Sequence, residues 1–288
     1  MTFADQILQG EHLTAINNIK AAVAAADYTA KVEPGDPVLT PEAEKAELQR
    51  YLQHSSTASF RTKTLIARKM MDTAASWVGR SVQFVGRENL AAVQGGAIVT
   101  SNHFSPIENL FVRSAARGHR LHIVSQLTNL MMHGVLGFLM NYGDTIPLGN
   151  RREWVGREFP ELIHKCLVRG QWVLIYPEQE MWFNYRKPRP VQRGAYYYAA
   201  RFNVPVVSMF VSMETTTRKV NKDFNAIKYT VHVLPPIYPD QTLGVRAASI
   251  KMAATDYAQK CAAYTAAYGK ELDYTFQPSD IAGWQQKG

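Results

Sequence analysis

The sequence predicts an α/β fold in which a largely parallel central sheet is flanked by helices and preceded by an N-terminal helical extension. Two observations indicate this architecture. After residue 80, short apolar runs rich in β-branched residues alternate with stretches of helical periodicity, as in strands joined by helices. Before residue 80, the chain shows helical periodicity interrupted by turn-forming residues at 33–37 and 55–57. We therefore expect a helical region over residues 1–80 and an α/β domain with a C-terminal helix over residues 81–288.

The N-terminal region is expected to form three helices, at residues 3–27, 41–53 and 63–80. Thr40 and Pro41 suit the N-cap and first turn of the second helix. The third helix combines Trp77 and apolar residues with a basic rim. Such a helix either packs on the main domain or lies on a lipid surface.

The α/β domain is expected to contain seven strands and five helices. Strands are predicted at residues 81–85, 97–100, 121–124, 145–148, 172–176, 205–211 and 229–234. Helices are predicted at residues 106–117, 129–141, 153–169, 194–202 and 242–268. The segment 129–141 is unusually apolar, and we expect either a core helix or a deformable, methionine-rich wall for a hydrocarbon chain.

Bulk composition limits the classes of function. Lys and Arg number 32 against 24 Asp and Glu, so the net charge of +8 favours an anionic partner. No nucleic-acid motif accompanies this charge, so we expect an acidic lipid surface or a phosphorylated substrate and no nucleic acid. Two distant cysteines indicate a reducing compartment and no structural zinc. The start lacks the pattern of a signal peptide, and no apolar run suits a spanning helix, which together predict a cytoplasmic protein that meets a membrane from its surface.

His103 and Glu108 form the first candidate constellation. The buried strand at 97–100 runs into a tight connection that holds His103, and Ser105-Pro106 suits the start of a helix. On one continuous helix, residues five apart point about 140° away from each other, so the pair can converge only if His103 precedes the helix. A histidine held by a carboxylate is a general base. Alternatively, Ser-x-x-Glu is only a capping box.

Two further segments offer charged side chains at the same edge of the sheet. Arg151 and Arg152 follow the predicted strand at 145–148, and paired arginines can bind phosphate. Glu178, with Glu180 two residues later, follows the strand at 172–176. Because the carboxyl ends of parallel strands meet at one edge, we expect Glu178 near His103.

These blocks resemble the glycerolipid acyltransferases typified by lysophosphatidate acyltransferase, over roughly residues 80–240. That family carries Asn-His with an acidic residue after four intervening positions, a Gly-led strand ending in Arg, Phe-Pro-Glu-Gly-Thr-Arg, and a Val-Pro strand. The corresponding residues here are Gly86–Leu90 as a lead-in, Asn102-His103 with Glu108, Gly143 to Arg152, Tyr176-Pro177-Glu178, and Val204-Pro205.

The sequence departs from the family pattern at several positions. Glu108 replaces the usual Asp, Gly149 stands where a phosphate-binding Arg is expected, and Gln179-Glu180-Met181 replaces Gly-Thr-Arg. Two expected cations are therefore missing. Either the acceptor is not lysophosphatidate, or arginines from elsewhere reach into the pocket, and we favour this relocation. The candidates for it are Arg151, Arg152, Arg186 and Arg193.

The resemblance implies an O-acyltransferase that uses acyl-CoA or acyl-carrier protein and a lysophospholipid hydroxyl, at the inner face of the cell membrane. His103 would be the base and Glu108 would orient it. Neither a metal nor a cofactor is expected. Substrate contacts are expected from Asn102, Arg151, Arg152, Glu178, Gln179, Glu180, Arg186 and Arg193. The alternatives are a glycolipid or another acceptor, and a non-catalytic lipid-binding protein of the same fold.

Overall fold

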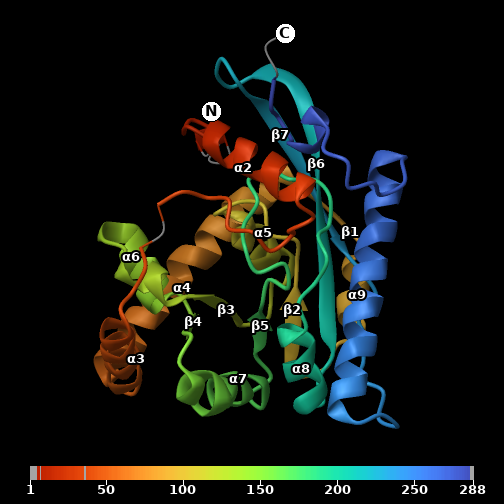
Figure 1. The fold of residues 1–288 in the computed structure, drawn as a ribbon. Coiled ribbons are helices and arrows are strands. Elements are labelled where there is room, and N and C mark those ends of the chain that lie inside the picture. The colour runs from red at the N-terminus through yellow and green to blue at the C-terminus, as the bar shows by residue number, and fades with distance from the viewer. Residues whose placement is uncertain (1–4, 7, 36, 286–288) are drawn as a thin grey trace.

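The central sheet has seven strands in the order β1-β7-β6-β2-β5-β3-β4, in the computed structural model, which describes residues 5, 6, 8–35 and 37–285 (Figure 1). Neighbouring strands run parallel except β6 and β7. The strands are β1 (Val82–Val85), β2 (Ala97–Thr100), β3 (Leu121–Gln126), β4 (Thr145–Leu148), β5 (Trp172–Leu174), β6 (Val206–Lys219) and β7 (Asn225–Val233). The predicted fold class is confirmed.

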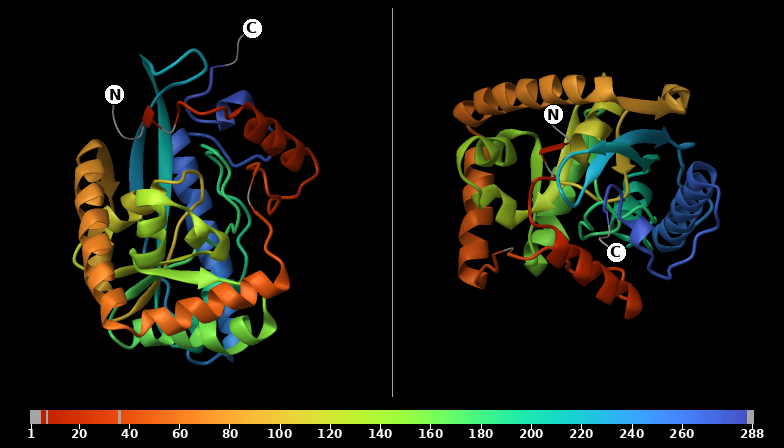
Figure 2. Two further views of the ribbon diagram at one scale, coloured as in Figure 1. Left: turned by 90° about the vertical axis from the view of Figure 1, so that its left-hand side faces the viewer. Right: turned by 90° about the horizontal axis from the view of Figure 1, so that it is seen from above.

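Helices cover both faces of this sheet. They are α2 (Leu13–Ala24), α3 (Pro41–Ser55), α4 (Ala58–Val78), α5 (Glu108–Ala115), α6 (Gly134–Tyr142), α7 (Phe159–Leu167), α8 (Gly194–Arg201) and α9 (Val245–Tyr268). Helices α4 and α5 pack on one face, and α7, α8 and α9 pack on the other (Figure 2). Short 3-10 turns and one π-helical turn, Trp154–Glu158, complete the regular structure.

Strand β2 lies at the centre because every side chain in it is apolar or small and buried. Ala97 and Val99 face the cluster that includes α4 and α5, whereas Ile98 faces the cluster that includes α7 and α8. A strand buried on both faces has no alternation of polar and apolar residues, which is typical of parallel sheets. This continuous burial explains why its predicted bounds, residues 97–100, are confirmed.

Strand β6 is the largest departure from the predicted strands. It runs eight residues beyond the predicted run 205–211 and forms a long antiparallel hairpin with β7. The additional residues are mostly polar and exposed, so no apolar run marked them. Their pairing partner, rather than their own composition, determines the strand.

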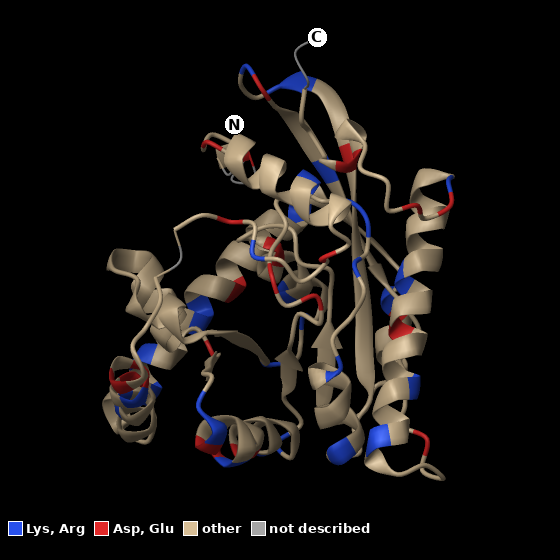
Figure 3. Ribbon diagram, in the orientation of Figure 1, with Lys and Arg blue, Asp and Glu red and all other residues tan. Residues whose placement is uncertain are grey.

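The segment predicted as the helix 129–141 is not a core helix. A 3-10 turn, Leu127–Met131, precedes α6, which begins at Gly134, a residue with φ of +66°. Within α6 only Gly137 is buried, and the helix carries no charged residue (Figure 3). Val135 and Leu136 are exposed by 67% and 54%, so α6 is an apolar helix at the surface.

The N-terminal region packs on the sheet domain. Leu48 and Tyr51 of α3 belong to the same core cluster as Ile98 of β2. Helix α4 buries Ala67, Met71 and Ala75, whereas Leu65 and Trp77 remain exposed by 61% and 53%. The predicted helix at 3–27 is shorter, with α2 spanning Leu13–Ala24, and residues 3, 4 and 7 lie outside the described residues. None of the described helices is long and apolar enough to cross a lipid bilayer.

Candidate active site

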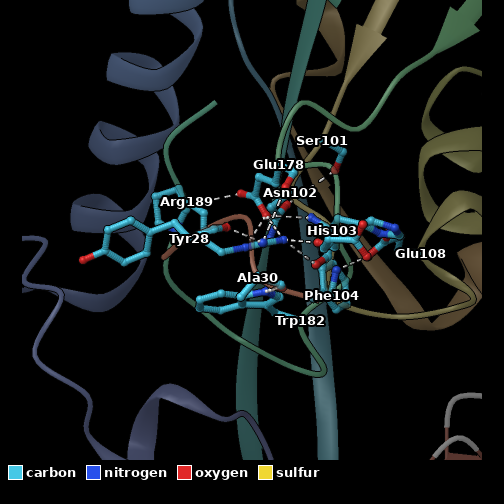
Figure 4. Close-up of polar contacts among 12 residues, drawn as sticks. Tyr28, Ala30, Ser101, Asn102, His103, Phe104, Glu108, Glu178, Trp182 and Arg189 are labelled. Carbon is cyan, nitrogen blue, oxygen red and sulfur yellow. Dashed lines mark hydrogen bonds and ion pairs between the residues drawn. The ribbon is translucent and has the colours of Figure 1, made fainter. Parts of the chain in front are cut away.

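His103 and Glu108 meet at the carboxyl end of β2. The strand ends at Thr100, His103 lies in the following connection, and Glu108 is the first residue of α5. The Nδ1 atom of His103 contacts Oε1 of Glu108 directly (Figure 4). If Nδ1 donates its hydrogen to the carboxylate, Nε2 is left with the lone pair of a base. The arrangement is therefore that of a histidine oriented by a carboxylate.

Glu108 also organises the backbone before its helix. Its Oε2 accepts hydrogen bonds from the backbone N–H groups of Phe104, at 2.5 Å, and Ser105, at 2.8 Å. The predicted start of this helix was wrong in detail, because Ile107 is the N-cap and Pro106 lies in a turn. The bonds to Phe104 and Ser105 therefore hold the connection that precedes the helix and do not cap the helix itself. One carboxylate thus fixes this connection and holds the histidine.

The ring of His103 is fixed on a second side by Tyr176. The two rings stack with centroids 4.1 Å apart and an interplanar angle of 9°. Burial, together with the neighbouring Glu108 carboxylate, holds the pKa of the Tyr176 phenol well above its usual value. Tyr176 therefore presents a neutral ring face, and the side chain of His103 stays 22% exposed.

Glu178 lies next to His103, as its position after β5 predicts, but its side chain is buried beneath the cavity wall. It is 2% exposed, and its Oε2 accepts hydrogen bonds from the backbone N–H of His103, at 3.1 Å, and from Nε of Arg189, also at 3.1 Å. An ion pair of 3.0 Å joins Arg189 to Glu178 (Figure 4). Glu178 does not line the cavity, so its predicted role as a substrate contact is replaced by one in holding the His103 backbone.

Arg189 is the residue that the sequence-based reasoning missed. Its guanidinium is 1% exposed and donates from every nitrogen: to Glu178, to the carbonyl of Tyr28 at 2.9 Å, and to the carbonyls of His103 and Glu180. It therefore ties together the connections after β2 and β5 and the segment before α3. The basic run at 186–189 was visible in the sequence, but nothing in it distinguished Arg189 from Arg186.

Asn102 fixes the neighbouring strand rather than a substrate. Its amide nitrogen donates to the carbonyl of Val211 at 3.1 Å, and its oxygen accepts from the N–H of Val211 at 2.8 Å. The residue is 1% exposed and does not line the cavity. The predicted substrate contact is thus replaced by a clamp between β2 and β6.

A cavity of about 950 Å³ opens beside His103. Its lining includes His103, Glu108, Tyr176 and the segment 179–181. Apolar side chains form another part of the wall, among them Met132, Leu136, Leu139, Met140, Val155 and Phe159. Helix α6 and the turn before it thus supply the methionine-rich wall that was one of the two predictions for 129–141.

The four arginines expected to replace the missing cations do not line this cavity. Arg186 donates to the carbonyl of Ser279, at 2.8 Å, and to Thr215, and it lines a separate groove. Arg151 donates weakly to Glu153 at 3.4 Å, and Arg152 and Arg193 are exposed. The prediction that these four arginines reach into the pocket is therefore wrong.

Gly149 shows why a cation is missing at its position. A Cβ atom there would lie 2.9 Å from Oε1 of Glu44 and 3.0 Å from Cδ1 of Leu48. Glu44 also accepts hydrogen bonds from the backbone N–H groups of Asn150 and Arg151. Helix α3 therefore occupies the space that an arginine side chain at residue 149 would need.

Gln179 and Glu180 line the cavity, as expected of substrate contacts. Gln179 has a φ of +66°, a left-handed conformation that favours glycine. Glu180 accepts a hydrogen bond of 3.4 Å from Gln126. Among the described residues, no three of His, Cys, Asp and Glu are placed to hold a metal ion together.

Comparisons with known proteins find one family model and a solved structure that are similar to this chain. Residues 81–212 match the model of the family described as Acyltransferase. A crystal structure of the 1-acyl-sn-glycerophosphate acyltransferase PlsC from Thermotoga maritima is similar at 13% identity and a TM-score of 0.45, over 85% of this chain and 97% of that one. No curated protein matches the chain significantly in sequence. The match to the acyltransferase family model thus extends from β1 to the middle of β6 and includes His103, Glu108 and Glu178.

Proposed function

We propose that this protein is an acyltransferase that moves a fatty acyl group from an acyl thioester to the hydroxyl of a lysolipid. The observation that carries the proposal is the contact between His103 and Glu108 at the wall of a cavity that is partly lined by the apolar side chains of α6. An apolar wall suits an acyl chain, and an oriented histidine suits the activation of a hydroxyl.

The proposed reaction is a direct transfer. Nε2 of His103 takes the proton of the acceptor hydroxyl while its oxygen attacks the thioester carbonyl. The C–S bond of the resulting tetrahedral intermediate then breaks, and the thiolate leaves with the proton that His103 carried. Glu108 stabilises the imidazolium between these steps. The chain has no Gly-x-Ser-x-Gly sequence, so an acyl-enzyme on the serine of such a motif is not part of the proposal.

The expected partners follow from the same site. The donor is acyl-CoA or an acyl-carrier protein, and the acceptor is a single-chain amphiphile of the lysophospholipid type. No metal ion and no cofactor takes part in the proposed steps.

We also propose that the protein works at the inner face of the cell membrane, with α4 and α6 toward the lipid. These helices pack against each other. Leu65 and Trp77 of α4 and Val135 and Leu136 of α6 are exposed apolar side chains, and the net charge of +8 favours anionic lipid. Apolar surface beside the mouth of an acyl-chain cavity would let the lipid enter without crossing water.

An assay of transfer tests the proposal. The wild-type protein is incubated with labelled acyl-CoA or labelled acyl-carrier protein and a panel of lysolipids, and acylated product is separated from free fatty acid. We expect an ester product and one thiol released per ester. Thiol release with free fatty acid alone would contradict acyl transfer and indicate hydrolysis.

Flotation with vesicles tests the membrane contact separately. We expect binding to anionic vesicles that weakens as salt is raised, and weaker binding to neutral vesicles. Trp77→Ser should reduce binding to both, whereas Val168→Ser, which removes an exposed apolar side chain outside α4 and α6, should not. Equal binding to both vesicle types at all salt concentrations would contradict the electrostatic part.

A further inference from the structure

We infer that the acceptor of this enzyme has a head group rich in hydrogen-bond donors, hydroxyl or ammonium, and carries no phosphate monoester, and that Gln179 and Glu180 recognise it. The inference rests on the proposed function, because it assigns the head group of the lipid whose hydroxyl meets His103.

The segment 179–181 is held directly against the base. The backbone N–H of Trp182 donates to the carbonyl of His103 at 3.0 Å, and Arg189 donates to the carbonyls of both His103 and Glu180 (Figure 4). All three residues of the segment line the cavity. An acceptor that presents its hydroxyl to Nε2 of His103 therefore has its head group beside this segment.

The backbone of Gln179 is strained. Its φ of +66° places a side chain in a conformation that costs about 1 kcal/mol relative to glycine. Glycine, the residue that the family motif carries here, would remove this cost. Gln179 is exposed to the cavity, and none of its side-chain atoms has a hydrogen bond among the described residues. A strained residue whose amide faces a substrate cavity is a candidate for recognition.

The charges on the cavity wall disfavour a phosphate monoester. The described residues that line the cavity include four glutamates, Glu33, Glu44, Glu108 and Glu180. Lys31 is the only lysine or arginine among these lining residues. A monoester near −2 placed beside Glu180 would meet a like charge without a paired cation. The carboxylate of Glu180 is a hydrogen-bond acceptor, so its natural partner is a donor.

Arg189 cannot supply the missing cation. It is the arginine tied to His103, but it is 1% exposed and its N–H groups are engaged by Glu178 and by the carbonyls of Tyr28, His103 and Glu180. Turning it toward a ligand would leave the buried Glu178 carboxylate without its ion pair.

Competing acceptors test the inference. The wild-type enzyme receives lysophosphatidate, lysophosphatidylethanolamine and a monoacylated glycosyl-glycerol with one acyl chain in common, and kcat/KM is measured for each. We expect at least a tenfold preference for one of the donor-bearing acceptors over lysophosphatidate. A preference for the ethanolamine lipid identifies an ammonium head group, and a preference for the glycosyl lipid identifies hydroxyls.

Three variants assign the effect to residues. Gln179→Gly should raise the KM of the preferred acceptor several-fold while Tm stays equal to or above that of the wild type, which a purely structural residue would not do. Glu180→Gln should weaken the binding of an ammonium-bearing acceptor more than the binding of a neutral one. Met181→Arg should shift the ratio of kcat/KM values toward lysophosphatidate about tenfold. Gln53→Ala, a change of an exposed amide on α3 that does not line the cavity, is the control, and it should leave the ratio unchanged.

The outcomes separate this inference from the proposed function. Lysophosphatidate as the best acceptor of the wild-type enzyme, or wild-type KM values in Gln179→Gly, would overturn the inference and leave acyl transfer standing. Failure to acylate any hydroxyl would overturn the proposed function and this inference with it.

Discussion

Two buried charged clusters lie beside the end of β2, and they differ in what they can do. The base cluster consists of His103, Glu108, Glu178 and Arg189, and the helix cluster consists of Thr100, Tyr196, Asp256 and Lys260. In the helix cluster, Lys260 and Asp256 are both 0% exposed and lie 2.6 Å apart, and Thr100 donates to Asp256 at 2.9 Å. Both clusters join distant elements through paired charges.

The difference is access. No member of the helix cluster lines either of the two described cavities, whereas His103 and Glu108 line the larger one. Only the base cluster adjoins a left-handed non-glycine residue, Gln179. A buried ion pair alone is therefore weak grounds for a functional site, and a partly exposed histidine on a cavity wall is stronger.

Removing the charge of Glu108 should have the largest effect on catalysis. In Glu108→Gln the side-chain oxygen can still accept from Phe104 and Ser105, but the amide would face Nδ1 and favour the tautomer whose Nε2 carries hydrogen. We expect kcat to fall by about 10² to 10⁴ with little change in Tm. Glu161→Gln, an exposed change, is the control. Full activity together with a lower Tm would show that Glu108 only stabilises the connection before α5.

Breaking the helix cluster should affect stability instead. Lys260→Met leaves Asp256 buried without its cation, and we expect the free energy of unfolding to fall by about 3–5 kcal/mol while kcat per folded molecule is retained. Adding Asp256→Leu to Lys260→Met should recover part of the stability. Chemical denaturation and an activity measurement on the same samples distinguish this outcome from a catalytic role.

His122 provides a second histidine with which to sharpen the comparison. It lies in β3, is 8% exposed, and contacts Gln171 through Nε2 at 2.8 Å. Burial lowers the pKa of His122 from 6.5 to about 4. Between these values the unfolded chain binds the additional proton, so stability is present above pH 6.5 and is lost as the pH falls toward 4.

His122→Gln should therefore reduce acid sensitivity. The wild-type protein and the variant are unfolded with denaturant at pH 7 and at pH 5. The free energy of unfolding that is lost between these two pH values should be about 2 kcal/mol smaller in the variant. An unchanged loss would show that His122 does not titrate on unfolding in this range. Activity at pH 7 should be retained, because His122 lines neither cavity.

The smallest expected effect comes from Arg189→Lys. Lysine keeps the charge beside Glu178 but loses the planar fork that reaches four groups. We expect kcat to fall about tenfold with a smaller change in KM, because the position of His103 is disturbed rather than the acceptor contacts. Arg186→Lys, a change in the same basic run outside the cavity, is the control. A change confined to Tm would make Arg189 structural only.

The sequence predicted those parts of the fold whose composition determines their structure. The fully buried strand Ala97–Thr100 and the convergence of His103 with Glu108 follow from local apolar runs and helix-start signals. The polar half of β6 did not follow, because its pairing with β7 is a tertiary property. The exposed position of α6 could not be predicted either, because the sequence of an apolar helix has the same pattern in a core as on a cavity wall.

The charged residues around the site were harder to predict. Arg186 and Arg189 are three positions apart in one basic loop, and only the folded chain shows that Arg189 turns inward and Arg186 outward. The packing of α3 against Gly149 likewise depends on residues more than 90 positions earlier. Local patterns thus predicted the meeting of His103 and Glu108, and tertiary contacts determined which cations surround them.

The most direct test of the central claim is the rate of acyl transfer by His103→Ala beside His54→Ala, an exposed histidine on α3. Ester formation is followed with the best donor and acceptor of the wild-type enzyme, after Tm values have shown that both variants are folded. The account predicts a loss of about 10² to 10⁴ in kcat for His103→Ala and wild-type activity for His54→Ala. Transfer by folded His103→Ala at the wild-type rate would contradict it.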